Sequence, residues 1–180
     1  TRRYGAAIEC CHRAQNEGAS PFYAAYAYAL RAHAFAAQGN FDAASLELAG
    51  GRAARIPAPM LNAGEALLAA RTGHADRALR LLAALDRETP MESYGCELAA
   101  AAAGSLGNAA VATHFLRAAE TIDQRHIAAW RLSPELRPIR PAREFVELVG
   151  LRGCRLVWPS EAPPLPAEDR ALFQDYQEAS

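Results

Sequence analysis

The sequence predicts an all-α protein built from repeated helical hairpins, and three observations lead to that prediction. About 43 of the 180 residues are alanine, the strongest helix former. Isoleucine and valine, which β-strands favour, are few. A glycine followed by a helix-like stretch recurs every 34 residues, at Gly39, Gly73 and Gly107, and a fixed spacing of this length indicates a repeat array.

Composition and charge exclude several classes of protein. All 19 basic residues are arginine and face 20 acids, so a net charge of −1 offers no basic surface to nucleic acid or membrane. No stretch approaches the roughly 18 apolar residues of a membrane-spanning helix. We expect free thiols and a cytoplasmic location, because the cysteines lack metal-ligand spacing and the adjacent pair would point apart on a helix. These cysteines are Cys10, Cys11, Cys96 and Cys154. The absence of lysine suggests GC-rich coding and therefore a bacterial source.

Each repeat carries what two closely packed antiparallel helices require. Small residues occupy the predicted helix crossings, in the pairs Ala32 and Ala44, Ala66 and Ala78, and Ala100 and Ala112. The glycines between the helices tolerate the positive φ of a tight turn. A leucine four residues after the second alanine fills the next layer of the stack, at Leu48, Leu82 and Leu116.

Capping signals place the helix starts. Ser20-Pro21 predicts an N-cap followed by proline in the first helical position. Thr89-Pro90-x-Glu92 predicts a second N-cap followed by proline, here with a capping box between Thr89 and Glu92. We expect helices at about 4–15, 21–37, 41–54, 59–71, 75–86, 90–104 and 108–121.

A 34-residue period with a small residue, a turn glycine and Ala-x-x-x-Leu resembles the tetratricopeptide repeat. The resemblance covers residues 25–58, 59–92 and 93–126, and a partial repeat at 4–15 matches a second helix alone. It implies an α-α superhelix, a helical-repeat solenoid of about three hairpins over residues 1–131. Because the first repeat is incomplete, we expect the chain to begin within an array and to be part of a longer protein.

Residues 132–150 break the repeat pattern and are expected to cap the last repeat. Residues 124–131 fit a short helix, Ser133-Pro134 begins a turn, and prolines interrupt residues 136–141. Ala142 to Val149 fits an amphipathic helix whose inward residues are Phe145, Val146 and Val149. The Pro-Glu-Leu segment resembles the close of repeat arrays attached to bacterial transcription regulators and kinases.

Residues 151–180 are expected to form a proline-rich tail. Residues 163–166 are stiff and extended, and residues 167–178 fit an acidic helix carrying Leu172, Phe173 and Tyr176. Six arginines lie in residues 131–155 and five acids in residues 156–180. We therefore expect the tail to pair with the basic segment and to pack back on the array.

No catalytic constellation is visible, and no enzyme activity, cofactor or metal is expected. Glu9-x-x-His12 has the spacing used in di-iron helix bundles, but the second pair that such a site needs is missing. An exposed helix face is the simpler interpretation. Cys11 is expected in the core, and His114 and His126 at helix surfaces or in partly buried positions.

The candidate site is the concave groove that the family resemblance implies along the first helix of each repeat. The chain lacks the lysine and asparagine residues that clamp a C-terminal carboxylate in chaperone-binding members. A shallow, mostly apolar trough is left, with two tyrosines, one arginine (Arg71) and one glutamate (Glu97), and the sequence leaves open whether these two charges meet. The implied wall is Tyr26, Ala29, His33, Ala36, Ala37, Met60, Ala63, Leu67, Ala70, Arg71, Tyr94, Glu97, Ala101, Gly104 and Ser105. The residues expected to contact a partner are Tyr26, His33, Met60, Leu67, Arg71, Tyr94 and Glu97.

This groove predicts a non-catalytic protein–protein interaction scaffold that holds a peptide or protein segment, without direct contact to nucleic acid or membrane. One alternative is a sensor or oligomerisation segment of a larger bacterial transcription regulator or kinase, in which case two copies of the chain could form a homodimer. Another is a chaperone for a secreted or assembled client protein. The groove could also be lined by small residues only because helices crowd there, or be filled by the tail.

Overall fold

The computed structural model describes residues 2–16, 21–54, 58–85, 92–122, 130 and 133–150. Helices make up most of this part of the chain, and no strand occurs in it. The helices are α1 (Arg2–Asn16), α2 (Pro21–Ala37), α3 (Phe41–Ala53), α4 (Ala58–Arg71), α5 (Ala75–Leu85), α6 (Ser93–Ser105), α7 (Ala109–Ile122), the 3₁₀ helix η2 (Pro134–Ile139) and α9 (Arg143–Gly150). The all-α prediction is confirmed for these residues.

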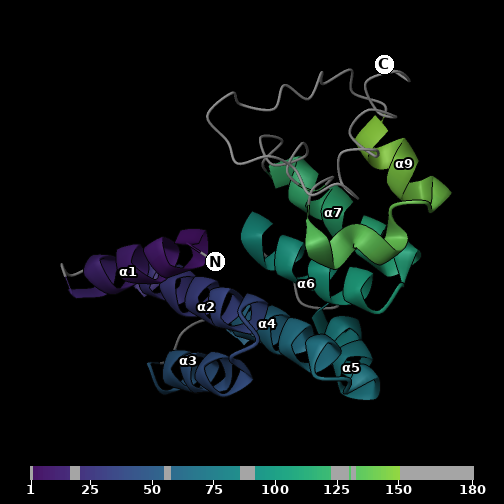
Figure 1. The fold of residues 1–180 in the computed structure, drawn as a ribbon. Coiled ribbons are helices and arrows are strands. Elements are labelled where there is room, and N and C mark those ends of the chain that lie inside the picture. The colour runs from purple at the N-terminus through teal and green to yellow at the C-terminus, as the bar shows by residue number, and fades with distance from the viewer. Residues whose placement is uncertain are drawn as a thin grey trace.

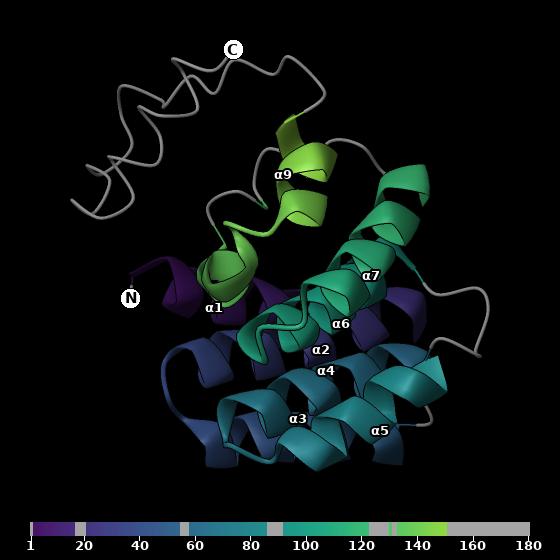
Figure 2. The same cartoon turned by 90° about the vertical axis from the view of Figure 1, so that its right-hand side faces the viewer.

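Consecutive helices pair as hairpins, and the first helices of the hairpins form a row (Figure 1). Helix α2 packs against α3, α4 against α5, and α6 against α7. Helix α4 lies between α2 and α6 and contacts both, while α1 packs on α2. At the other end η2 covers α6 and α9 covers part of α7 (Figure 2). We call the surface formed by α2, α4 and α6 beneath η2 the α2–α4–α6 face.

The three hairpin turns have the same atomic structure. Gly39, Gly73 and Gly107 have φ of 79°, 81° and 72°. The residue after each glycine donates its backbone N–H five residues back, over 2.9, 2.8 and 2.9 Å, as in a Schellman motif. Asn40 and Asn108 then cap α3 and α7 by accepting the backbone N–H three residues ahead, over 3.2 and 3.1 Å. The predicted role of the glycines is confirmed.

Five of the six predicted crossing residues lie in one continuous core, and the sixth, Ala78, is buried as well. All six crossing alanines and the three layer-filling leucines are buried. The pKa of the Cys11 thiol is raised mainly by burial, and the positive charge of Arg31 opposes this shift. The pKa of Cys96 is raised to about 11 by burial and by Glu97. The expected exposed positions of Glu9, His12 and His114 are confirmed as well.

Two expectations about the helices are corrected. Helix α6 begins at Ser93, because Glu92 is extended (φ −65°, ψ 154°) and makes no side-chain capping bond, so Glu92 is not part of a capping box. At this start the buried Ser93 hydroxyl donates to the carbonyl of Ala119 in α7 over 3.5 Å. In α9 the buried face holds Phe145, Leu148 and Val149, whereas Val146 is 41 % exposed. Val146 lies about 100° around the helix from Phe145, which turns it away from α7.

Several expectations lie outside the described residues. They concern Ser20, Thr89 and Pro90 as caps, the short helix at 124–131 except Trp130, His126, Cys154, and the whole of 151–180. Within the described part, no helix is both long and apolar enough to cross a membrane.

Candidate functional site

The α2–α4–α6 face binds a carboxylate that belongs to η2. Arg71, the last residue of α4, places Nη1 2.8 Å from Oε1 of Glu135. His33 of α2 places Nε2 3.7 Å from the same oxygen, and the Ser133 hydroxyl donates to Oε2 over 3.0 Å. Only 5 % of the Glu135 side chain is exposed. Two helices distant in sequence therefore hold one buried acid.

The environment of Glu135 keeps it ionised. Burial alone would raise its pKa, but the nearby His33 imidazole, a backbone N–H and the Ser133 hydroxyl together lower the pKa to about 2. The Arg71 guanidinium adds a charge-assisted hydrogen bond in the same direction. Glu135 is consequently an anchor and cannot exchange a proton near neutral pH.

An aromatic row continues the site along the same face. His33 Nδ1 lies 3.2 Å from the Tyr94 hydroxyl of α6. The ring of Tyr94 stacks on Tyr26 of α2, with centroids 5.7 Å apart and 27° between planes. Burial, followed by the charge of Glu97, raises the pKa of Tyr94 far above 10, and burial with Glu92 and Glu97 also raises that of Tyr26. Both phenols stay neutral and act as hydrogen-bonding, stacking surfaces.

Two further contacts hold Trp130 and residues 133–150, which we call the capping segment, on α6. The Trp130 indole, 4 % exposed, donates to Glu97 Oε1 over 3.3 Å. Leu136 is buried directly on the backbone of Gly104, where a Cβ would lie 2.7 Å from Leu136 Cδ2 and 2.8 Å from the carbonyl oxygen of Glu135. A glycine is therefore required here by close approach of η2.

These contacts leave a cavity of about 320 Å³ between α6 and the capping segment. Its lining is mostly apolar, with the polar groups of the carboxylate network at one side. The lining residues are His33, Tyr94, Glu97, Leu98, Ala101, Leu116, Trp130, Ser133, Glu135 and Leu136.

The structure brings together five of the seven residues expected to contact a partner: Tyr26, His33, Arg71, Tyr94 and Glu97. Met60 and Leu67 are corrected, because they are 6 % and 1 % exposed and belong to the core between helices. Arg71 and Glu97, whose proximity the sequence left open, have different partners. Arg71 binds Glu135, and Glu97 accepts the Trp130 indole.

Sequence reasoning missed the residues that η2 and its neighbours contribute, namely Trp130, Ser133, Glu135, Leu136 and Arg140. Arg140 is buried and donates Nη2 to the carbonyl of Ser133 over 3.2 Å, which closes the turn around Glu135. One signal was present in the sequence. Arg71 is the only charged residue at the α4 wall positions, and a half-buried arginine needs an acid from elsewhere in the chain.

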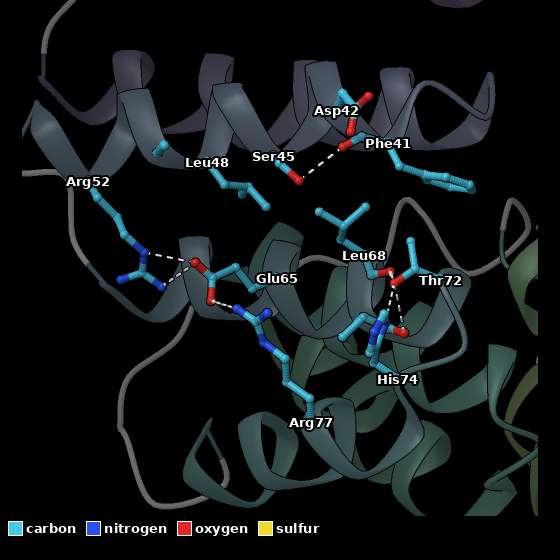
Figure 3. A pocket seen from close by; sticks show the side chains of 12 residues that line it. Phe41, Asp42, Ser45, Leu48, Arg52, Glu65, Leu68, Thr72, His74 and Arg77 are labelled. Atoms are coloured by element: carbon cyan, nitrogen blue, oxygen red, sulfur yellow. Dashed lines mark hydrogen bonds and ion pairs between the residues drawn. The ribbon is translucent and has the colours of Figure 1, made fainter.

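A second hollow, of about 410 Å³, lies between α3, α4 and α5 (Figure 3). Its charges neutralise one another: Glu65 accepts Arg52 at 2.7 Å on one oxygen and Arg77 at 3.5 Å on the other. Thr72 and His74 pair at 3.0 Å on its far side. Among the described residues no group of three or more His, Cys, Asp or Glu side chains is arranged to hold a metal ion.

No family model, curated protein or solved structure matches the chain. Function is therefore argued from the α2–α4–α6 face itself.

Proposed function

We propose that the protein is a non-catalytic, tetratricopeptide-like scaffold whose α2–α4–α6 face binds a protein segment with an acidic anchor. The observation that carries this proposal is the seating of Glu135. Side chains from two repeats hold its carboxylate, and a third repeat contributes Tyr94 and the backbone of Gly104 beneath the segment. The chain's own Trp130 and residues 133–139 occupy the surface that a partner segment would use.

The titration properties of the site support a binding role. Glu135 is held ionised by a pKa of about 2, and Tyr94 is held neutral by its raised pKa. General acid–base chemistry needs a group whose pKa lies near the working pH. Neither residue meets that requirement, whereas both suit recognition of a fixed charge and an aromatic or aliphatic neighbour.

The proposal is tested with a fluorescein-labelled peptide of residues 130–141, titrated into the full-length chain. A tethered segment has an effective concentration of about millimolar, so the wild type excludes the peptide. Glu135→Ala weakens the tethered segment, and we expect this variant to bind the peptide with a Kd on the order of micromolar. Fluorescence anisotropy measures the affinity, and circular dichroism verifies the helical fold.

Matched variants identify the face. Adding Arg71→Ala to Glu135→Ala removes the partner of the peptide's carboxylate, and we expect at least about tenfold weaker binding. Adding Arg77→Ala instead, an arginine of α5 that pairs with Glu65, leaves the affinity unchanged. A folded Glu135→Ala chain that binds no peptide at millimolar concentration would contradict the proposal.

A further inference from the structure

An apolar cleft opens between α5 and α7, away from the α2–α4–α6 face. It measures about 430 Å³, and Leu79, Leu82, Ala83, Val111 and Phe115 form most of its lining. Leu79 is 42 % exposed, so a large aliphatic side chain faces water at the cleft. Among the described residues, none of those that line it carries a carboxylate.

The cleft differs from its counterpart one repeat earlier. The counterpart is the hollow between α3, α4 and α5. Residues 34 positions apart in the sequence correspond, so Ser45 in that hollow corresponds to Leu79 in the cleft, and Arg77 to Val111. Packing of the array tolerates polar side chains at these positions, as the first hollow demonstrates. The apolar lining of the second cleft is therefore not a requirement of the repeat fold, and an apolar occupant accounts for it.

Two exposed arginines are close in sequence to residues that line the cleft. Arg80 follows Leu79 in α5 and Arg117 stands three residues after His114 in α7, and neither forms an ion pair with another described residue, while one exposed acid, Asp76, precedes Leu79 by one turn. His114 of α7 also lines the cleft, and its ring lies edge-on to that of Phe115, with ring centroids 5.4 Å apart. An occupant with an apolar face and acidic flanks complements this surface.

The chain contains one segment with those properties beyond the described residues. In residues 167–178, Leu172, Phe173 and Tyr176 fall on one face of a helix, and the segment carries four acids against one arginine. A helix of this length spans about 18 Å, close to the length of α7. The 16 residues after α9 can extend to about 50 Å, which is more than the length of α7, the helix that α9 packs against.

We propose that residues 167–178 form an amphipathic helix that docks in the α5–α7 cleft of the same chain. Leu172, Phe173 and Tyr176 cover the apolar lining, and the acids face Arg80 and Arg117. The inference is independent of the proposed function, because η2 already fills the α2–α4–α6 face and the tail uses a different surface.

Amide hydrogen exchange on the full-length chain tests the docking. We expect Leu172→Asp with Phe173→Asp to accelerate exchange at least about tenfold in residues 79–85 and 110–115, while α2 and α4 keep their rates. Leu165→Asp, in the proline-rich part of the tail, is the matched control and leaves all rates unchanged. The reciprocal variant Leu79→Asp accelerates exchange in residues 167–178.

Two results would overturn the inference. Equal exchange rates in α5 and α7 for the wild type and the Leu172→Asp/Phe173→Asp variant would place the tail elsewhere. Protection that disappears on dilution would identify a second copy as the donor of the helix and refute docking within one chain. Peptide binding at the α2–α4–α6 face is measured separately and does not depend on either outcome.

Discussion

Gly104→Ala isolates the seating of η2 on α6 from every charge in the site. A Cβ at this position would lie 2.8 Å from the carbonyl oxygen of Glu135 and 3.3 Å from Leu136 Cα. Both are backbone atoms, so no rotamer change relieves the contact. The third close atom, Leu136 Cδ2 at 2.7 Å, belongs to a buried side chain with little room to move.

Two opposing terms set the magnitude. Alanine in place of glycine inside a helix is worth about 1 kcal/mol of added stability. Overpacking a close backbone contact costs about 1–3 kcal/mol, and loss of the η2 contacts adds to that cost. We expect Gly104→Ala to lower the free energy of unfolding by about 1–2 kcal/mol. Gly5→Ala in α1, where nothing lies within 4 Å of the new Cβ, is expected to raise it by about 0.5–1 kcal/mol.

Urea unfolding followed by circular dichroism measures both variants in a Trp158→Phe background. Trp130 is then the only tryptophan, and its emission reports directly on the capping segment. We expect a shift to longer wavelength in Gly104→Ala, because displacement of η2 hydrates an indole that is 4 % exposed. If Gly104→Ala stabilised the chain like Gly5→Ala and left the emission unchanged, the close contact of η2 with α6 would be refuted.

Three further predictions concern the charge network, the turns and the cap. The folded pKa of Glu135 is about 2, below its usual 4.5, so the stabilisation that the ionised Glu135 gives is full above pH 4.5 and is lost as the pH falls through 2. Glu135→Gln should therefore lower the free energy of unfolding by about 3 kcal/mol at pH 7 and by progressively less towards pH 2, as measured by urea titrations. Gly107→Ala places a side chain at φ of 72° and should cost about 1–2 kcal/mol, measured as the shift in the urea midpoint at constant slope. In α9, Phe145→Ala should lower the free energy of unfolding by about 3–5 kcal/mol and Val146→Ala by no more than about 0.5 kcal/mol, so equal losses would contradict the observed helix orientation.

The hairpins could be predicted because their determinants are local. A glycine at positive φ, an asparagine cap and an alanine at the crossing act within one or two turns of helix, and each recurs every 34 residues. The two predictions that were wrong, the start of α6 and the buried face of α9, concern contacts with more distant parts of the chain. Ser93 begins α6 where its hydroxyl meets Ala119 of α7, and α9 turns Leu148 rather than Val146 towards the core.

Sequence alone therefore determined most of the helices and the three turns, since these follow from short-range backbone and packing preferences, while the wall residues came from the family resemblance and two of them, Met60 and Leu67, lie in the core. Only the tertiary structure decided what covers that wall. Arg71 and Glu135 are 64 residues apart, and Trp130 and Glu97 are 33 apart, so neither pairing has a periodic signature. Both pairs form because α4 and α6 are packed side by side and the glycine at 104 leaves room for η2 to reach the backbone of α6.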